Sequence, residues 1–221
     1  MTSLRRATFR IFLSTVCLWM AVAQAATREQ VTDFFRAVQM DDVKTVRSLL
    51  GSTVNPNDIN PIGGEPAMVN ALREGSMRVF DVLLAHPGTD LEAQAVNGNT
   101  ALMMAAFKHN APAVRALLAK GAAVNRPGWS ALHYAAAAGD DGITRVLLEH
   151  GAKLDATSPA GTGLFTPLMM AAREGHESTA LLLTDQGANP GLKNSEGLTA
   201  AQLAERAGKT QVAAAITGRV R

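Results

Sequence analysis

A short motif recurs along this chain about every 33 residues, and this repetition limits the fold more than any other feature. The clearest copies begin at Thr100, Ser130 and Thr166, with the sequences TALMMAA, SALHYAA and TPLMMAA. A weaker copy begins at Thr199, and two degenerate copies begin near residues 33 and 66. The six starts lie at 33, 66, 100, 130, 166 and 199, so the spacings are 33, 34, 30, 36 and 33 residues. Spacings of about 20 to 50 residues indicate a solenoid of stacked units.

Each repeat has the signals of two short helices. Thr or Ser at the start can cap a helix, and Pro167 stands at a first helical position, where no backbone N–H is needed. A helix-ending residue follows nine positions after each start, as at Gly139 and Gly175. An apolar residue also recurs 17 positions after each start, at Leu50, Leu83, Leu117, Leu147, Leu183 and Ile216. One pair of helices cannot bury its apolar face alone, so the pairs must stack.

These features resemble the ankyrin repeat, whose hallmark is Thr-Pro-Leu-His-x-Ala-Ala followed by Gly, a leucine pair and Gly-Ala. The resemblance covers about residues 27–217, although no copy is perfect: Thr166-Pro167-Leu168 keeps the proline, and only His133 keeps the histidine. It implies an all-α solenoid of about six helix–turn–helix units joined by short β-turn or hairpin loops. The first and last units depart most from the motif, as expected of caps.

Residues 1–25 have the pattern of a secretory signal peptide. Three arginines lie within the first ten residues, an apolar run covers 11–23, and Ala23-Gln24-Ala25 is a small-x-small cleavage site. We expect cleavage after Ala25, leaving 26–221 as the ankyrin-repeat domain in the periplasm. An uncleaved anchor, twin-arginine export and secretion beyond the cell are the alternatives.

The chain expected after cleavage is nearly neutral. The signal removes three basic residues and no acidic ones, which leaves 18 Lys and Arg against 19 Asp and Glu. This balance gives no reason to expect a nucleic-acid partner, and no polybasic cluster indicates a membrane surface. The only cysteine, Cys17, leaves with the signal, so we expect a monomer stabilised by packing without disulfides.

Residues typical of catalysis or metal binding are not grouped in the sequence. The five histidines do not occur at metal-ligand spacing with cysteines or carboxylates. Ser130 and His133 resemble a nucleophile and its base, but a helix cap and the motif histidine explain them better. Gly161-Thr162-Gly163 lacks the Gly-Lys-Thr/Ser of a phosphate loop. We therefore expect no metal, no cofactor and no enzymatic activity.

The resemblance implies that a partner protein binds in a concave groove lined by loop tips and first helices. In ankyrin repeats, the contacts come from positions just before each start and seven or eight residues after it. Two large aromatics, Trp129 and Phe165, directly precede starts, and Phe107 lies seven residues after one; we expect these rings to be exposed and to anchor a partner. The alternative is that the rings pack against neighbouring turns. The expected binding residues are Phe107, Trp129, Phe165, Lys108, Arg126, Arg173, Glu174, Arg73, Glu74, Asn97 and Asn99.

The function expected from these observations is that of an exported protein-binding scaffold with an unidentified partner. The loop at 156–165 lengthens one unit and is either a mobile functional segment or a tolerated insertion. Three other functions remain open: an effector that acts on a host or competitor protein, a groove-located enzyme or metalloprotein, and a stabiliser of an exported enzyme.

Overall fold

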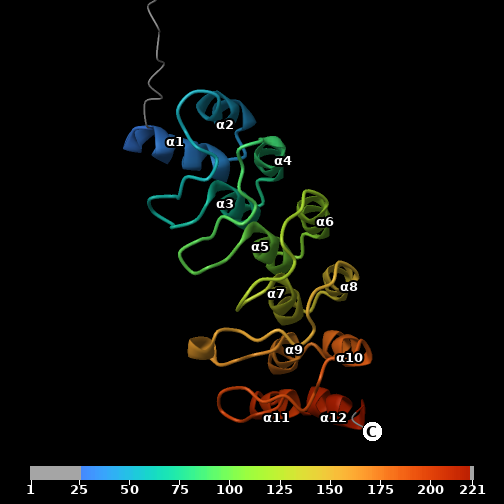
Figure 1. Cartoon of the computed structure of the whole chain (residues 1–221). Coiled ribbons are helices and arrows are strands. Elements are labelled where there is room, and N and C mark those ends of the chain that lie inside the picture. Colours follow the sequence, from blue (N-terminus) through green and yellow to red (C-terminus); the bar gives the residue numbers. More distant parts are fainter. Residues whose placement is uncertain (1–25, 220–221) are drawn as a thin grey trace, which may run out of the picture.

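The computed structural model describes residues 26–219, and it contains the stacked helix pairs that the repeat predicts. Figure 1 shows the pairs following one another from α1 to α12, with the connecting loops projecting on one side. No strand occurs among these residues; a single bridge joins Ile59 and Pro66. The helices are α1 (Arg28–Gln39), α2 (Val43–Leu50), α3 (Ala67–Glu74), α4 (Met77–Ala85), α5 (Ala101–Phe107), α6 (Ala111–Ala119), α7 (Ala131–Ala138), α8 (Asp141–Glu149), α9 (Pro167–Glu174), α10 (Glu177–Asp185), α11 (Ala200–Arg206) and α12 (Thr210–Arg219), with a 3-10 turn η1 (Ala160–Thr162) between α8 and α9.

The helices form two rows. The first helix of each unit packs on the first helices of the adjacent units, so that α3, α5, α7, α9 and α11 follow α1 in one row. The second helices form the other row, and each also packs on its partner within the unit. We call the loops at 51–65, 86–99, 120–129, 150–165 and 186–198 fingers. The inner face is the surface that the first helices and the fingers form together.

The predicted repeat starts are helix caps in units two to six. The side chain of Thr100 accepts a hydrogen bond from the backbone N–H of Met103, and Thr166 does the same for Met169. Pro66, Ser130 and Thr199 occupy the same position before α3, α7 and α11. The sequence therefore predicted where the first helix of each of these units begins.

Unit one differs from its prediction. Its helix begins at Arg28, because Thr27 and Gln30 form a reciprocal capping box well before the expected start at 33. The left-handed residue that ends the first helix is Asp41 (φ 54°), which corresponds to Gly139 and Gly175 of later units. The register of unit one is thus displaced by one residue, so that Leu50 corresponds to Leu148 of unit four, and both are only half-buried.

A single apolar core extends through all six units. The other five residues predicted 17 positions after each start are buried, and Leu83, Leu117, Leu147 and Leu183 are completely so. The alanine pairs of α5, α7 and α9 have no exposed surface, which lets the first helices approach closely. Among the described residues, no helix combines the length and apolar character needed to cross a bilayer.

Most fingers are closed by a backbone hydrogen bond to the residue directly before a repeat start. The acceptors are the carbonyls of Glu65, Asn99, Phe165 and Leu198, at 2.8–2.9 Å. The lengthened finger folds on itself in the same way, because the Ser158 N–H donates to the Phe165 carbonyl and the Phe165 N–H donates to Ser158 Oγ. Its tip carries η1 away from the helix rows (Figure 1).

Candidate functional site

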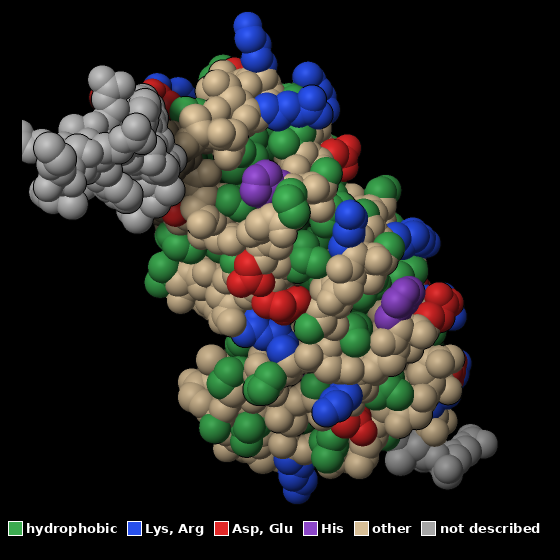
Figure 2. All heavy atoms as spheres, turned by 45° about the horizontal axis from the view of Figure 1, so that its top comes forward, with side chains coloured by type: hydrophobic (Ala, Val, Ile, Leu, Met, Phe, Trp, Pro, Cys, Tyr) green, Lys and Arg blue, Asp and Glu red, His purple; other side chains and the backbone are tan. Residues whose placement is uncertain are grey.

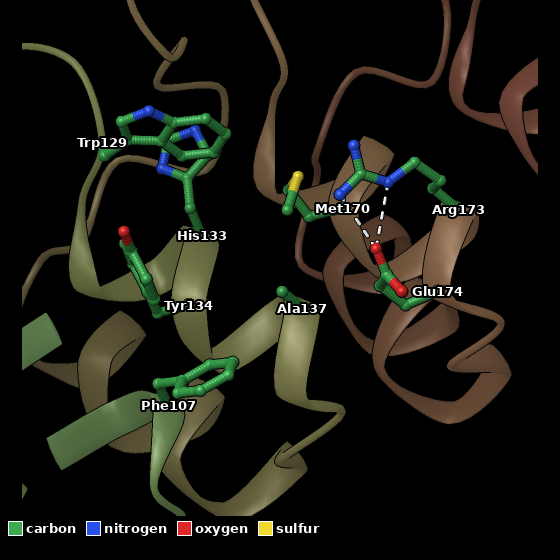
Figure 3. A pocket seen from close by; sticks show the side chains of 8 residues that line it. All are labelled: Phe107, Trp129, His133, Tyr134, Ala137, Met170, Arg173 and Glu174. Atoms are coloured by element: carbon green, nitrogen blue, oxygen red, sulfur yellow. Dashed lines mark hydrogen bonds and ion pairs between the residues drawn. The ribbon is translucent and has the colours of Figure 1, made fainter. Parts of the chain in front are cut away.

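A pocket of about 310 Å³ opens on the inner face at units three, four and five. Aromatic side chains form one side, and a charged pair from α9 forms the other, with Ala137 between them (Figure 3). The lining residues are Phe107, Trp129, His133, Tyr134, Ala137, Met170, Arg173 and Glu174. We call this cavity the aromatic pocket.

The pocket exists because unit four has a small residue seven positions after its start. In units two and five this position is an arginine that reaches back to the finger of its own unit. Arg73 Nη1 lies 2.6 Å from Glu65 Oε2, and the Arg173 guanidinium carbon lies 5.0 Å from the centroid of the Phe165 ring. Unit four has Ala137, which is too short to reach Trp129, so the corresponding space stays open.

The aromatic side of the pocket is built from rings that meet edge to face. The centroids of Phe107 and Tyr134 are 6.1 Å apart with an interplanar angle of 90°. Trp129 lies 6.3 Å from Tyr134 at 67° and 5.2 Å from His133 at 77°. Such perpendicular contacts are favourable because the positive edge of one ring meets the negative face of another.

Hydrogen bonds hold the aromatic side in place from behind. The Tyr134 hydroxyl donates to the side-chain oxygen of Asn99, which is buried in the preceding finger. Burial raises the pKa of the Tyr134 phenol, so this hydroxyl keeps its proton at neutral pH. Tyr134 is therefore fixed at both ends, by its helix and by its hydroxyl.

His133 is a buried, neutral histidine beneath Trp129. Its Nδ1 accepts from the Ser130 backbone N–H at 3.2 Å, so its Nε2 carries the proton and donates to the Phe165 carbonyl at 3.0 Å. Burial lowers the pKa of His133 from 6.5 to about 4, although hydrogen bonds to backbone oppose the shift. The motif histidine thus links unit four to the finger of unit five.

The opposite side of the pocket is an ion pair. Arg173 Nε and Nη2 both donate to Glu174 Oε1, at 3.0 and 2.9 Å (Figure 3). The same guanidinium lies over the Phe165 ring, which is a cation–π geometry. Arg173 and Glu174 are therefore fixed close together, and each charge has a partner within the protein.

The structure brings four of the predicted binding residues into the pocket: Phe107, Trp129, Arg173 and Glu174. Lys108 is exposed and ends α5 next to Phe107. Arg73 and Glu74 form their own ion pair two units away, at 2.8 Å. The predicted set therefore spans the inner face, and part of it converges on one cavity.

Two predicted binding residues are not exposed, and for Phe165 the expectation of an exposed ring was wrong. Phe165 is 9% exposed because the Arg173 side chain covers its ring, and its backbone is bonded to Ser158. Asn99 is 8% exposed because its side chain is occupied by Tyr134. For Phe165, the structure agrees with the alternative, in which the ring packs within the repeat array instead of binding a partner.

The two remaining predicted residues lie on the fingers. Arg126 is half-buried and donates from Nη1 to the Gly98 carbonyl at 3.0 Å, which connects neighbouring fingers. Asn97 is exposed at a finger tip, where its side-chain oxygen accepts from the Asn99 N–H at 3.1 Å. Both contribute to the shape of the finger row.

Tyr134 and Met170 line the pocket but were not among the predicted binding residues. Both stand four positions after a repeat start, where the sequence motif has residues that look like core. The equivalent Asn70 of unit two donates to Glu65 of its finger. A polar residue at this position signals that the position faces a finger, and this signal could have identified Tyr134.

Figure 2 shows acidic and basic side chains interspersed with apolar ones on the face that it presents. Within residues 26–219, no group of three or more His, Cys, Asp or Glu is placed to hold a metal ion. The aromatic pocket is thus the candidate site with the clearest geometry.

Comparison with known proteins identifies the repeats. A family model described as "Ankyrin repeats (3 copies)" matches residues 34–127 and 68–158, and a model described as "Ankyrin repeat" matches 164–195. These matches cover more than half of the chain and include every unit that lines the pocket.

Curated proteins also match this chain. Human "Transient receptor potential cation channel subfamily A member 1" is 31% identical over 69% of this chain, and "Protein glp-1" of Caenorhabditis elegans is 30% identical over 84% of it. "RelA-associated inhibitor" of Mus musculus is 37% identical over 44%. The matched segments are 14%, 15% and 12% of these proteins, so the chain spans only a small part of their length.

Proposed function

This chain belongs to the ankyrin-repeat family, and we propose that it is a scaffold that binds another protein on its inner face, with the aromatic pocket as the centre of the contact. Ankyrin repeats indicate a protein–protein interaction scaffold. The observation that supports the aromatic pocket as the binding location is the exposure of apolar aromatic surface around a preformed cavity. Phe107 is 50% exposed, and the half-buried Trp129 and Tyr134 continue its surface inwards.

The composition of the pocket supports protein binding. Trp, Tyr and Arg dominate the residues that contribute most binding energy at protein interfaces. Trp129, Tyr134 and Arg173 lie together here, and each is held by contacts that exist before any partner arrives. A rigid surface loses little conformational entropy on binding, so more of the contact energy becomes affinity.

A catalytic function finds less support. Ser130 Oγ lies 2.8 Å from His133 Nδ1, which is the distance expected of a nucleophile and its base. However, these side chains are 2% and 0% exposed, and the histidine ring is already bonded to backbone at both nitrogens. A substrate could not reach this pair without disrupting the repeat.

We further propose that the protein acts outside the cytoplasm, in the periplasm. The support is the sequence pattern of residues 1–25, which lie outside the residues that the structure describes. Cell fractionation with N-terminal sequencing tests this proposal: the expected product begins at Ala26 in the periplasmic fraction. A full-length product in the cytoplasm contradicts export, and a product in the medium favours the secreted effector.

The test of the binding proposal is affinity capture with the full chain as bait in an extract of its source cells. A second bait carries Phe107→Ala and Trp129→Ala. A third, matched bait carries two truncations on the row of second helices, Arg115→Ala and Arg145→Ala, where the side chains are exposed and lie outside the pocket lining. Circular dichroism checks that all three baits fold alike, and mass spectrometry identifies the captured proteins.

A protein held by the first and third baits and lost by the second supports binding at the aromatic pocket. A protein held equally by all three contradicts this location and moves the contact to another part of the surface. If no bait captures a protein, the proposed scaffold function is contradicted in that compartment.

A further inference from the structure

We propose that the aromatic pocket receives one bulky, uncharged apolar side chain of the partner, such as phenylalanine or leucine. This inference rests on the proposed binding function and adds the chemistry of the anchor. It follows from the shape, the size and the charge of the pocket.

The pocket is preformed and largely apolar. The rings of Phe107, Trp129 and Tyr134 provide one side, and Ala137 of α7 and Met170 of α9 provide the surface between these rings and the Arg173–Glu174 pair (Figure 3). The Tyr134 hydroxyl is satisfied by Asn99, so the tyrosine presents its ring to the cavity without an unpaired polar group. An apolar side chain that enters this space would displace water from the apolar walls on most sides. Removing apolar surface from water is favourable by roughly 25 cal/mol per Å².

The size of the pocket suits a large side chain. Its volume of about 310 Å³ is roughly twice that of the ~150 Å³ engineered cavity that binds benzene. A phenyl group or a leucine side chain therefore fits together with the first atoms of the backbone that carries it. A methyl-sized group would leave most of the wall without contacts, and unfilled space forfeits dispersion energy.

The charges beside the pocket favour a neutral occupant. Arg173 and Glu174 neutralise each other, and the Arg173 guanidinium is also held over Phe165. A charged side chain entering the pocket would lose water without gaining an unpaired counter-charge, and this desolvation is costly. Three aromatic rings can also attract a cation, but the paired Arg173 and Glu174 in the lining add no net negative charge to favour one.

The test measures binding of small probes by ¹⁹F NMR. The full chain is labelled with 5-fluorotryptophan, which gives two resonances, from Trp19 and Trp129, and Trp129→Phe assigns the pocket signal. The probes are the blocked amino acids N-acetyl-phenylalaninamide and N-acetyl-leucinamide, with N-acetyl-lysinamide and N-acetyl-glutamic acid α-amide as charged counterparts. We expect a saturable shift of the Trp129 signal with Kd on the order of 1–10 mM for the apolar probes, and at least tenfold weaker binding of the charged ones.

Two substitutions of neighbouring alanines control the location. Ala137→Leu fills the pocket and should abolish the shift, whereas Ala138→Leu makes the same change one residue further on, outside the lining, and should preserve it. Ala137→Arg is the second filling variant, because arginine stands at this position in units two, five and six. Equal binding of apolar and charged probes, stronger binding of the lysine probe, or binding that survives both filling variants overturns the proposal.

Partner capture separates this proposal from the scaffold function. If Ala137→Leu and Ala137→Arg lose a partner that Ala138→Leu retains, the proposal that a partner side chain enters the aromatic pocket is supported. If both filling variants retain a partner that the double variant Phe107→Ala, Trp129→Ala loses, the scaffold function stands. The proposal that a partner side chain enters the pocket is then overturned.

Discussion

At the scale of single residues, His133 connects the stability of the protein to pH. Its ring is buried and neutral, and burial lowers its pKa to about 4 from 6.5. Between these pH values the unfolded chain binds a proton that the folded chain does not. The free energy of unfolding must therefore decrease as the pH falls from 6.5 towards 4.

We predict that His133→Gln reduces this pH dependence. The contribution of His133 amounts to at most roughly 3 kcal/mol across the window, because one pKa unit corresponds to about 1.4 kcal/mol. Urea denaturation at several pH values between 4 and 7.5 measures the slope, and His150→Gln, at an exposed histidine, is the matched control. If His133→Gln and the unmodified protein lose stability equally over this range, a neutral His133 is contradicted.

The binding residues show what a repeat register can and cannot predict. The register assigned Phe107, Trp129, Arg173 and Glu174 to the groove, and the structure brings these four residues into one pocket. It could not predict that Phe165 would be covered, because this depends on the direction that the Arg173 side chain takes. The two aromatics directly before a repeat start therefore have different exposures.

At the scale of single elements, the end of α7 requires a glycine for two reasons, its backbone conformation and the close approach of His176. Gly139 has φ 71°, and a Cβ added there would lie 2.4 Å from Nδ1 of His176. The His176 ring also bonds through Nε2 to the Ala137 carbonyl at 3.0 Å. Gly208 ends α11 with nearly the same φ, 73°, but nothing would touch its added Cβ.

We predict that Gly139→Ala destabilises the protein more than Gly208→Ala does. The left-handed conformation alone costs roughly 1–2 kcal/mol in each variant. Gly139→Ala must also displace His176 and weaken its hydrogen bond, which adds about 1 kcal/mol. Chemical denaturation of the two variants measures the difference, and equal losses of stability would show that the His176 ring moves away freely.

The second helices contribute most of the largest buried aliphatic side chains. We predict that Leu147→Ala, in the last turn of α8, lowers the free energy of unfolding by about 2–5 kcal/mol, because Leu147 is completely buried and its removal leaves a cavity. Leu148→Ala, at the half-buried neighbouring position, should cost clearly less. Similar midpoints of denaturation for the two variants would contradict the assigned register of α8.

The starts of the first helices could be predicted in units two to six, from a capping residue or, at Pro66, from the repeat spacing, but not in unit one. Thr100, Thr166 and Thr199 signal their helices because a hydroxyl at this position satisfies a free N–H. Unit one lacks the motif, so its helix start and its one-residue displacement were missed. The spacings predicted the finger lengths, but they did not predict that Ser158 closes the lengthened finger, because the residues that make the equivalent backbone bond in other fingers, Asn60, Ala95 and Asn194, differ in type.

At the scale of the whole molecule, the core is continuous although each unit contacts only its neighbours. Buried apolar residues extend from Phe34 in α1 to Ile216 in α12 without a break between units. Bonds between fingers add further links, such as Val96 N–H to the Gly64 carbonyl and Ser195 N–H to the Gly163 carbonyl, both at 2.9 Å. Loss of packing in one unit should therefore destabilise distant units as well.

We predict that Leu83→Ala in unit two shifts the unfolding of unit four. In a Trp19→Phe background, Trp129 fluorescence reports on unit four, and far-UV circular dichroism reports on all helices. Both transitions should move together to lower denaturant concentration by an amount equivalent to about 2–5 kcal/mol. A Trp129 transition that stays in place while the dichroism becomes biphasic would show that the units unfold separately.

The alanine at position 137 also has a consequence for how such a protein diversifies over evolutionary time. In three other units, an arginine at the equivalent position reaches into its own finger, so the stack evidently accommodates either residue. A lineage can therefore open or close a recognition pocket in any unit by exchanging one side chain at the surface. The repeats can in this way acquire new binding partners while their buried residues, and hence the inherited fold, stay the same.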